Sequence, residues 1–293
     1  MQSVDAQSLN QLFKPSGSGG VYARTGTFDQ VTEGLQAFIS RNREAETEVL
    51  RFPPVMNRIQ LEQSGYLHSF PHLLGCVSSI QGDEAQVRSV VERPDWPQHL
   101  SATDLVLSPA ACYPVYPLAA DRGPVPASGL VFDVASYCFR REETHEVGRF
   151  QSFQMREYVC IGTPARVLDF RKRWIARGKE MAEQLGLEGE LAPASDPFFG
   201  RAGRLAAMSQ LEQSLKFEMR IPVRSKEEPT ACMSFNYHLD HFTAVWQLTS
   251  ESGEMVHTGC VAFGIDRLAL ALFATHGLDL KGWPATVREK LSV

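Results

Sequence analysis

The first third of the chain has the hydrophobic spacing of helices. From residue 28 to about residue 51, apolar side chains recur every three or four positions, and charged residues lie between them. This period places the apolar side chains on one face of a helix. Residues 56–64 and 83–92 predict two short helices, and residues 66–80 predict a helix or a strand. The recurring apolar residues of the long helix are Val31, Leu35, Phe38 and Ile39.

From Asp104 onward, the pattern changes to short apolar runs separated by Pro and Gly, which is typical of strands. Helices are expected at 163–185, 201–215 and 265–275. Few of the strand candidates are separated by a helix, so we expect an α+β fold with a central, mainly antiparallel sheet flanked by helices. The strand candidates cover residues 105–107, 112–116, 130–139, 153–161, 217–222, 232–237, 242–248 and 254–263.

The N-terminal 20 residues are expected to form a flexible arm. Residues 15–20 read Pro-Ser-Gly-Ser-Gly-Gly, a composition typical of flexible loops. The remaining residues, 21–293, are long enough for one large domain, and we expect a single one.

Composition argues against several classes of protein. The net charge of −5 lacks the basic excess typical of proteins that bind a large RNA. The six cysteines are scattered without Cys-x-x-Cys spacing, which argues against a self-contained zinc ribbon. The N-terminus lacks the pattern of a signal peptide, and no apolar run approaches the roughly 18 residues of a membrane span. We therefore expect a cytoplasmic protein with reduced thiols and no membrane contact.

One carboxylate stands out in the strand predicted at 153–161. Alternate residues of a strand share a face, and on this face Glu157 is the one charged residue among apolar ones. A carboxylate in such a place is costly unless it is paired, protonated or bound to a metal. Glu157 is therefore either part of a salt bridge or hydrogen bond in the core, or a ligand.

Two arginine-containing stretches lie more than a hundred residues apart. The first reads Phe-Arg-x-Glu at 139–142 and is followed by a loop and by Phe153; the second, 259–267, is a strand that leads into a helix with Arg267 in its first turn. Two arginines on rigid elements can hold a triphosphate from two sides. The pair resembles motifs 2 and 3 of class II aminoacyl-tRNA synthetases, whose chemistry joins a carboxylate to ATP.

Further segments make the resemblance more specific. The chain resembles the zinc-dependent seryl-tRNA synthetases of methanogens and, more closely, the amino acid:[carrier protein] ligases, from about residue 50 to residue 280. The segments that carry it are Phe-Pro-Pro-Val-Met at 52–56, Ser-Gly-Tyr-Leu-His-Ser-Phe-Pro at 64–71, Cys-Tyr-Pro-Val-Tyr-Pro at 112–117 and Ser-Phe-Asn-Tyr-His at 234–238. The resemblance implies a Zn²⁺ site made of Cys112, Glu157 and Cys260; spacing alone does not select these cysteines from the six.

The resemblance also implies roles for the nucleotide-binding residues. Arg140 would contact the α-phosphate and the amino acid carboxylate, and Arg267 would hold the γ-phosphate. Glu142 would accept a hydrogen bond from adenine, and Phe153 would stack on its ring. The remaining implied residues are Glu218 for the Mg²⁺ that accompanies ATP and Asn236 for the substrate.

The acceptor implied by the resemblance is the phosphopantetheine thiol of a carrier protein. No coiled-coil arm or Lys-rich extension is evident, so we expect no tRNA-binding domain and no tRNA partner. Carrier proteins are acidic, and a basic docking face could lie on the helix at 163–185 or on the one at 201–215. We favour the second helix, with Arg201, Arg204 and Lys216.

These inferences predict an ATP-dependent ligase that charges a carrier protein with a small amino acid, glycine or alanine. A truncated seryl-tRNA synthetase and a non-catalytic paralogue that binds an amino acid are the alternatives. A homodimer is expected, because the helix near 56–64 and a strand at 66–71 resemble the motif through which class II proteins dimerise.

Overall fold

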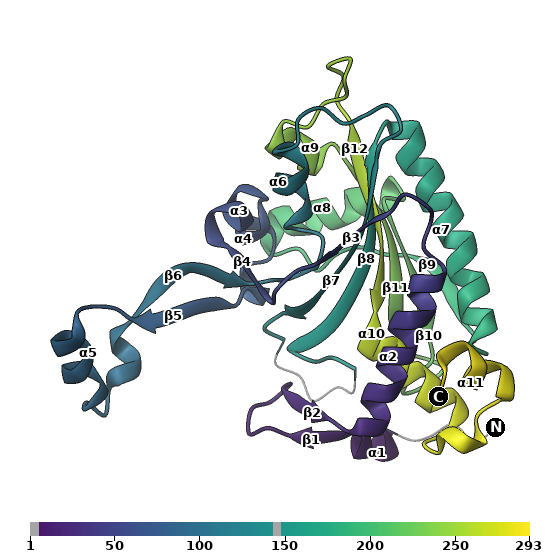
Figure 1. Cartoon of the computed structure of the whole chain (residues 1–293), viewed down its shortest axis with the longest axis horizontal. Coiled ribbons are helices and arrows are strands. Elements are labelled where there is room, and N and C mark those ends of the chain that lie inside the picture. The colour runs from purple at the N-terminus through teal and green to yellow at the C-terminus, as the bar shows by residue number, and fades with distance from the viewer. Residues whose placement is uncertain (1–5, 143–147) are drawn as a thin grey trace.

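The structure, a computed structural model, describes residues 6–142 and 148–293. A twisted sheet forms the centre of the molecule, with helices on both of its sides (Figure 1). The seven strands follow the order β3-β7-β8-β12-β11-β10-β9. Only β3 and β7 are parallel among the neighbours in this described sheet, which confirms the expected α+β fold with a mainly antiparallel sheet.

The strands of the central sheet are β3 (Glu48–Arg51), β7 (Leu130–Phe139), β8 (Ser152–Gly162), β9 (Glu190–Pro193), β10 (Lys216–Ile221), β11 (Thr230–Leu239) and β12 (His257–Gly264). The longer helices are α2 (Gly26–Arg41), α5 (Glu84–Val91), α7 (Pro164–Gln184), α8 (Gly200–Glu212) and α10 (Ile265–His276). The short helices are α1 (Ala6–Leu9), α3 (Arg58–Gln63), α4 (Tyr66–Ser69), α6 (Val115–Ala120), α9 (His241–Trp246) and α11 (Ala285–Leu291). Two small sheets are formed by β1 (Phe13–Pro15) with β2 (Tyr22–Arg24), and by β4 (Val55–Asn57), β5 (Cys76–Ile80) and β6 (Leu100–Leu107).

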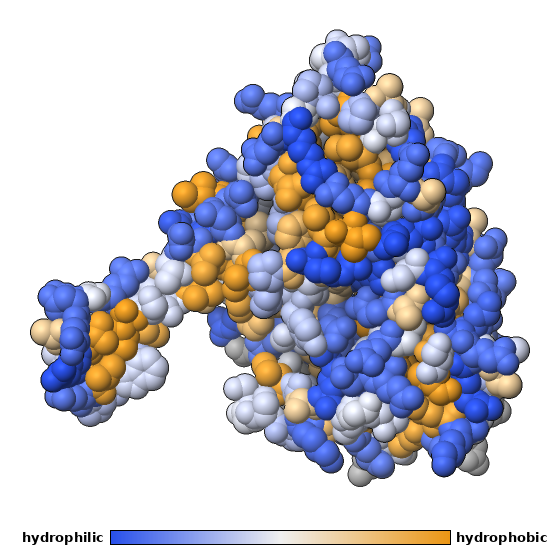
Figure 2. Space-filling model, in the orientation of Figure 1, coloured by the Kyte–Doolittle hydropathy of each residue, from blue (hydrophilic) through white to orange (hydrophobic). Residues whose placement is uncertain are grey.

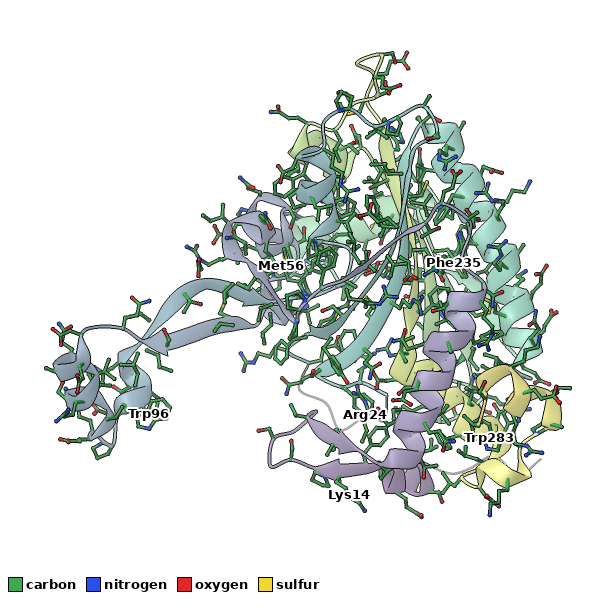
Figure 3. The ribbon with its side chains drawn as sticks, in the orientation of Figure 1. Lys14, Arg24, Met56, Trp96, Phe235 and Trp283 are labelled. Carbon is green, nitrogen blue, oxygen red and sulfur yellow. The ribbon has the colours of Figure 1, made fainter. Side chains whose placement is uncertain are left out.

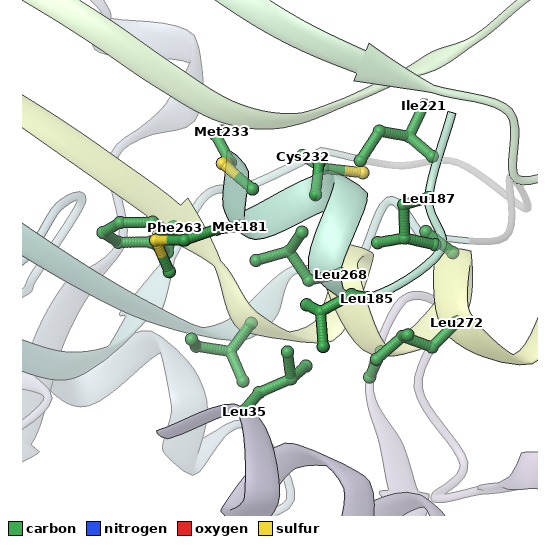
Figure 4. Close-up of a cluster of buried hydrophobic side chains, with 14 of the residues drawn as sticks. Leu35, Met181, Leu185, Leu187, Ile221, Cys232, Met233, Phe263, Leu268 and Leu272 are labelled. Carbon is green, nitrogen blue, oxygen red and sulfur yellow. The ribbon is translucent and has the colours of Figure 1, made fainter. Parts of the chain in front are cut away.

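The two faces of the sheet bury different cores. On one face, α2, α7 and α10 pack on alternate strand residues such as Tyr158, Val261 and Phe263, and Figure 4 shows part of this cluster. On the opposite face, Val159 and Ile161 pack with residues of α6 and α9. The second core is smaller, and the face that carries it also carries Glu157.

A buried ion pair lies beneath α2. Asp133 of β7 is 0% exposed and accepts hydrogen bonds from Arg156 of β8, from Nε at 2.8 Å and from Nη2 at 2.5 Å. Arg51 and Arg43 approach the same carboxylate at 3.3 Å each. Burial alone would raise the pKa of Asp133, but its hydrogen bonds and charge interactions with the arginines lower the pKa below its ordinary value.

Three predictions of secondary structure were wrong. The helix expected to reach residue 51 ends at Arg41, and residues 48–51 form the edge strand β3. Residues 112–116 and 242–248 were expected to be strands, but they lead into α6 and form α9. Short apolar runs fit either a strand or a buried helix, and here the ring of Tyr116 stacks on that of Phe242 at 4.0 Å between the two helices.

The motif expected to build a dimer also differs. Residues 66–71 were expected to be a strand, but Tyr66–Ser69 is helix α4, and β5 begins only at Cys76. Part of the expected N-terminal arm packs against the body, because Leu9, Leu12 and Phe13 belong to the main core. Residues 1–5 of that arm lie outside the described residues.

A ribbon made of β5 and β6 projects from the body and carries α5 at its tip (Figure 1). Apolar side chains gather along it in Figure 2, and Figure 3 places Trp96 near its end. The exposed apolar residues on this ribbon include Val91, Trp96, Leu100 and Leu105. No helix among the described residues is both long and apolar enough to cross a membrane.

Candidate active site

Strand register brings the predicted site residues into two rows. Cys260 of β12 lies opposite Asn236 of β11, and Asn236 lies opposite Lys216 of β10. In the next row, Glu157 of β8 lies opposite Ala262, Ala262 opposite Ser234, and Ser234 opposite Glu218. All of these side chains line one cavity of about 510 Å³. We call this side of the sheet the site face.

The two thiols and the carboxyl group predicted to converge do so. Cys112, Glu157 and Cys260 are 5%, 2% and 4% exposed, and the Glu157 carboxyl shares hydrogen bonds with both thiols. The Cys112 backbone N–H donates to Glu157 Oε1 at 3.0 Å. Cys112 reaches the site from a loop that precedes α6, not from the strand expected there.

Burial and mutual contact shift the pKa values of this group upward. The hydrogen bond to Cys260 and burial raise the pKa of the Cys112 thiol well above its ordinary value. Burial likewise raises the pKa of Glu157. In this arrangement, no group of three or more His, Cys, Asp or Glu side chains in the described parts of the chain is positioned to hold a metal ion.

Asn236 and His238 lie beside the Cys260 sulfur. Asn236 Nδ2 donates to Cys260 Sγ at 3.3 Å, and it also contacts Ser234 Oγ at 3.1 Å. His238 Nε2 lies 3.7 Å from the same sulfur, and its Nδ1 lies 3.0 Å from Thr258 Oγ1. Asn236 was predicted to face the substrate; it lines the cavity and holds the sulfur as well.

Arg140 enters the cavity at the end of β7. Its Nε donates to the Pro109 carbonyl at 3.1 Å, and its guanidinium lies over the Phe153 ring at 5.4 Å. Burial alone would lower the pKa of Arg140, but Tyr66 and other acidic neighbours raise it. Arg140 and Phe153 thus form one stack in the structure, beside the cavity in which both were predicted to bind the nucleotide.

Glu142 lies two residues beyond Arg140. Arg149 Nη1 lies 3.2 Å from Glu142 Oε2, and both residues line the cavity. The acceptor predicted for adenine therefore has a cationic partner in this structure.

Arg267 approaches the cavity from the first turn of α10. Its Nε donates to the Gly148 carbonyl at 3.0 Å, and its Nη1 donates to the Ala231 carbonyl at 3.1 Å. Burial and the nearby positive charge of Arg140 lower the pKa of Arg267. Two guanidinium groups that repel each other within one cavity form a site for a polyanion.

Lys216 does not belong to a docking surface, and this part of the prediction was wrong. It is the first residue of β10, it is only 9% exposed, and it faces the cavity. Its Nζ lies 2.6 Å from Asp196 Oδ1 and 3.3 Å from Glu218 Oε1. Glu218 also contacts Arg220 at 3.5 Å, so the predicted Mg²⁺ ligand has two cationic neighbours.

Arg201 and Arg204 lie on the exposed side of α8, as docking would require. This helix also exposes apolar residues at the same helical spacing. They are Leu205, Met208 and Leu211, which are 64%, 56% and 42% exposed, and they follow the exposed Phe199. The outer side of α8 is therefore both basic and apolar.

Sequence reasoning missed three residues of the cavity. Asp196 accepts from Lys216, His238 lies beside Cys260, and Tyr66 places a hydroxyl in the cavity lining that has no partner within the described residues. Asp196 lies outside regular structure, so no periodicity could reveal it. His238 has the same strand parity as Asn236, and that signal could have identified it.

Comparison with known proteins places this geometry in a family. Residues 98–276 match the class II tRNA synthetase core domain of the Gly, His, Pro, Ser and Thr enzymes. The seryl-tRNA synthetase of Methanopyrus kandleri, solved with an A. aeolicus tRNASec, has the same fold, with a TM-score of 0.83 and 23% identity over 97% of this chain and 59% of that one. A seryl-tRNA synthetase from Pyrococcus horikoshii, solved with ATP, gives a TM-score of 0.72 at 14% identity over the whole of this chain and 64% of that one.

Two curated relatives are much more similar. Amino acid–[acyl-carrier-protein] ligase 1 of Bradyrhizobium diazoefficiens is 58% identical over 97% of this chain and 88% of its own length. Ligase 2 of the same organism is 57% identical over 96% of this chain and 86% of its own length. A type-2 serine–tRNA ligase of Methanopyrus kandleri is 32% identical over 64% of this chain and 37% of its own length. The chain belongs to the amino acid–[acyl-carrier-protein] ligase family and is built on the class II tRNA synthetase core.

Proposed function

We propose that this protein activates a small amino acid with ATP and transfers it to the phosphopantetheine thiol of a carrier protein. The observation that carries the proposal is that one cavity joins a thiol–carboxyl cluster, two guanidinium groups and the inner side of α8. A chain 58% identical to an amino acid–[acyl-carrier-protein] ligase over nearly its whole length supports the same reaction. Glycine and alanine are the amino acids we expect.

The first step is in-line attack of the amino acid carboxylate on the α-phosphate of ATP, which releases pyrophosphate and forms the aminoacyl-adenylate. Arg140 stabilises the charge that develops at that phosphate, and the Pro109 carbonyl fixes the direction of its guanidinium. Arg267 holds the γ-phosphate, oriented by its bonds to the Gly148 and Ala231 carbonyls. Glu142 exchanges its contact with Arg149 for the adenine amino group.

Cys112, Glu157 and Cys260 would hold a Zn²⁺ ion after their side chains exchange their present mutual hydrogen bonds for the metal, because as they now stand the described residues form no metal site. Two sulfurs and one carboxylate are suitable zinc donors, and three buried acidic groups in contact form a site where a cation can replace protons. When bound, such an ion supplies an open position for the neutral amino group of the substrate. Asn236 donates to the Cys260 sulfur and so fixes this ligand. Glu218 would serve the Mg²⁺ that accompanies ATP, after release from Lys216 and Arg220.

The second step requires the carrier to dock and its thiol to attack the carboxyl carbon of the adenylate, which forms a thioester and releases AMP. The outer side of α8 combines Arg201 and Arg204 with the exposed Leu205, Met208 and Leu211. Positive charge suits an acidic carrier, and the apolar residues supply area to bury. The inner side of the same helix lines the cavity, so docking there brings the thiol to the site.

We also propose that the protein works as a homodimer. The edge strand β3 and the apolar side chains of the β5–β6 ribbon are exposed on the monomer. Exposed apolar surface and an open sheet edge are features that a second subunit covers.

The test follows label from a radioactive amino acid. Purified protein is first assayed for amino-acid-dependent exchange of pyrophosphate into ATP with each of the twenty amino acids. It is then offered tRNA or a phosphopantetheinylated carrier, with the carrier lacking its arm as the control. Label on the intact carrier alone supports the proposal. Label on tRNA would favour a seryl-tRNA synthetase, and a lack of exchange with every amino acid would favour a non-catalytic binder.

The metal proposal needs a separate measurement. Elemental analysis of the wild-type protein should give about one zinc per chain, and Cys260→Ser should lose most of it. Cys160→Ser is the matched control, because Cys160 is equally buried but lies on the opposite face of the sheet. Full activity in a Cys260→Ser protein without metal would refute the role of zinc.

A further inference from the structure

Helix α8 is attached to the body by few apolar contacts. Its only buried residue among those described is Gly203, where an added Cβ would lie 2.6 Å from the Phe198 carbonyl carbon. A helix with one buried glycine gains little from hydrophobic packing, so polar contacts must hold it in place. The inner side of α8 nevertheless forms a wall of the cavity, through Ala206, Ser209 and Gln210, and the wall continues at Gln213 just beyond the helix.

Gln210 connects this wall to the body through a closed pair of hydrogen bonds. Its Nε2 donates to Asp196 Oδ2 at 2.8 Å, and its Oε1 accepts from the Asp196 backbone N–H at 2.7 Å. Asp196 belongs to the segment between β9 and α8. Both ends of the Gln210 amide are therefore matched to one residue, which fixes the rotation of α8 about its axis.

Asp196 continues the connection into the sheet. Its second oxygen, Oδ1, accepts from Lys216 Nζ at 2.6 Å. Lys216 lies directly opposite Asn236, which donates to the Cys260 sulfur, and it also contacts Glu218. One chain of polar contacts thus runs from the middle of α8 to Glu218, and it passes through Lys216, the strand neighbour of Asn236.

We infer that Gln210, Asp196 and Lys216 form a bridge that positions α8 for transfer to the carrier thiol. The inference rests on the proposed function, because it assigns the bridge to the second step. None of the three residues needs to touch the reacting atoms. They hold the outer side of α8, where the carrier docks, in a fixed position relative to the cavity that binds the activated carboxyl group. They are positioning residues, and their effect belongs to transfer rather than to activation.

The bridge explains how a helix with so few buried apolar side chains can form part of an active site. An acceptor that docks on a loosely held helix would deliver its thiol over a range of positions, and a displacement of about 1 Å can cost about a hundredfold in rate. A bridge of charged and amide hydrogen bonds restricts that range without covering the apolar outer surface. Arg171 adds to this, because its Nη1 donates to the Ser214 and Leu215 carbonyls just beyond α8.

The test compares two glutamines of the same segment. Gln210→Met removes both bonds to Asp196 and keeps the length of the side chain. Gln213→Met is the matched control, because Gln213 also lines the cavity but its side-chain amide donates to Ser209 Oγ within the same segment. Each variant is measured by pyrophosphate exchange, by transfer to the carrier, and by hydrogen–deuterium exchange of the α8 amides.

In Gln210→Met, we expect pyrophosphate exchange to stay within about twofold of the wild-type value and the kcat of transfer to fall about tenfold or more. The α8 amides should exchange about tenfold faster, and Gln213→Met should match the wild type in all three measurements. The reciprocal variant Asp196→Asn with Gln210→Glu keeps a donor facing an acceptor at every contact, so it should recover transfer relative to Asp196→Asn alone.

Three results would overturn the inference. Unchanged protection of α8 in Gln210→Met would show that the bridge does not hold the helix. Equal losses in pyrophosphate exchange and transfer would assign the bridge to general stability. A rise in the carrier KM with unchanged kcat would assign Gln210 to docking. If the wild-type protein transfers nothing to a carrier, the proposed function fails, and protection of α8 still decides whether the bridge exists.

Discussion

Two consecutive residues of β8, Arg156 and Glu157, face opposite sides of the sheet. A substitution of Arg156 should lower stability and spare activity, whereas a substitution of Glu157 should lower activity and spare stability. Arg156 is 1% exposed and bonded to Asp133, which is 0% exposed. Arg156→Met leaves that carboxylate buried without its closest partner, at a cost of about 3–5 kcal/mol. Because Arg51 and Arg43 still approach Asp133 at 3.3 Å, we expect the lower end, about 3 kcal/mol.

The assay is urea unfolding followed by circular dichroism, with pyrophosphate exchange measured on the same samples. A loss of this size leaves a domain with a typical stability of about 5–15 kcal/mol folded at 25 °C, so exchange should stay near the wild-type rate. Glu157→Gln should instead keep most of the stability and lose exchange. The matched control is Arg58→Met, which breaks a pair whose side chains are 42% and 38% exposed and should cost under about 1 kcal/mol. If Arg156→Met costs no more than Arg58→Met, the assignment of stability to the buried pair is wrong.

Three further predictions follow from the same contacts. The folded-state pKa of Asp133 lies below its ordinary value. The stability that the ionised Asp133 contributes is therefore complete above about pH 4 and is lost as the pH falls through the folded pKa. On acid titration, the stability of Asp133→Asn should decline less than that of the wild type. Arg267→Ala should lower kcat/KM for ATP in pyrophosphate exchange by about a hundredfold and leave the zinc content unchanged, whereas a parallel loss of metal would point to misfolding. Arg201→Glu with Arg204→Glu should raise the carrier KM about tenfold at low salt and leave exchange intact, and a similar effect from Arg88→Glu on the β5–β6 ribbon would contradict docking on α8.

The long strands and helices of this protein were predictable because their patterns are long. Residues 130–139 and 153–161 alternate over enough positions to identify β7, β8 and the buried face that carries Glu157. The secondary structure of the segments near Cys112 and Phe242 was not predictable. A few apolar residues beside Pro or at a chain reversal fit a helix and a strand equally well.

The sequence also predicted only part of the candidate site. Arginine and cysteine positions followed from the resemblance to a known family, but the bridge did not. Lys216 reads as a basic residue at the end of a helix, and only its register opposite Asn236 turns it toward the cavity. Asp196 and Gln210 are fourteen residues apart, and no periodic pattern pairs a loop carboxylate with a helical amide.

The separation between the sheet and α8 bears on how such an enzyme changes its acceptor. Neighbouring strands are held about 4.8 Å apart by their ladders, so the intervals among Cys260, Asn236 and Lys216 are almost invariant under mutation. The stretch from β9 to β10 enters and leaves at an edge of the sheet and contributes little to its core. With the carrier docked on α8 as proposed, exchange of that stretch would alter which acceptor is served and leave Cys260, Asn236 and Arg267 in place. A scaffold of this kind separates the evolution of partner choice from the evolution of chemistry.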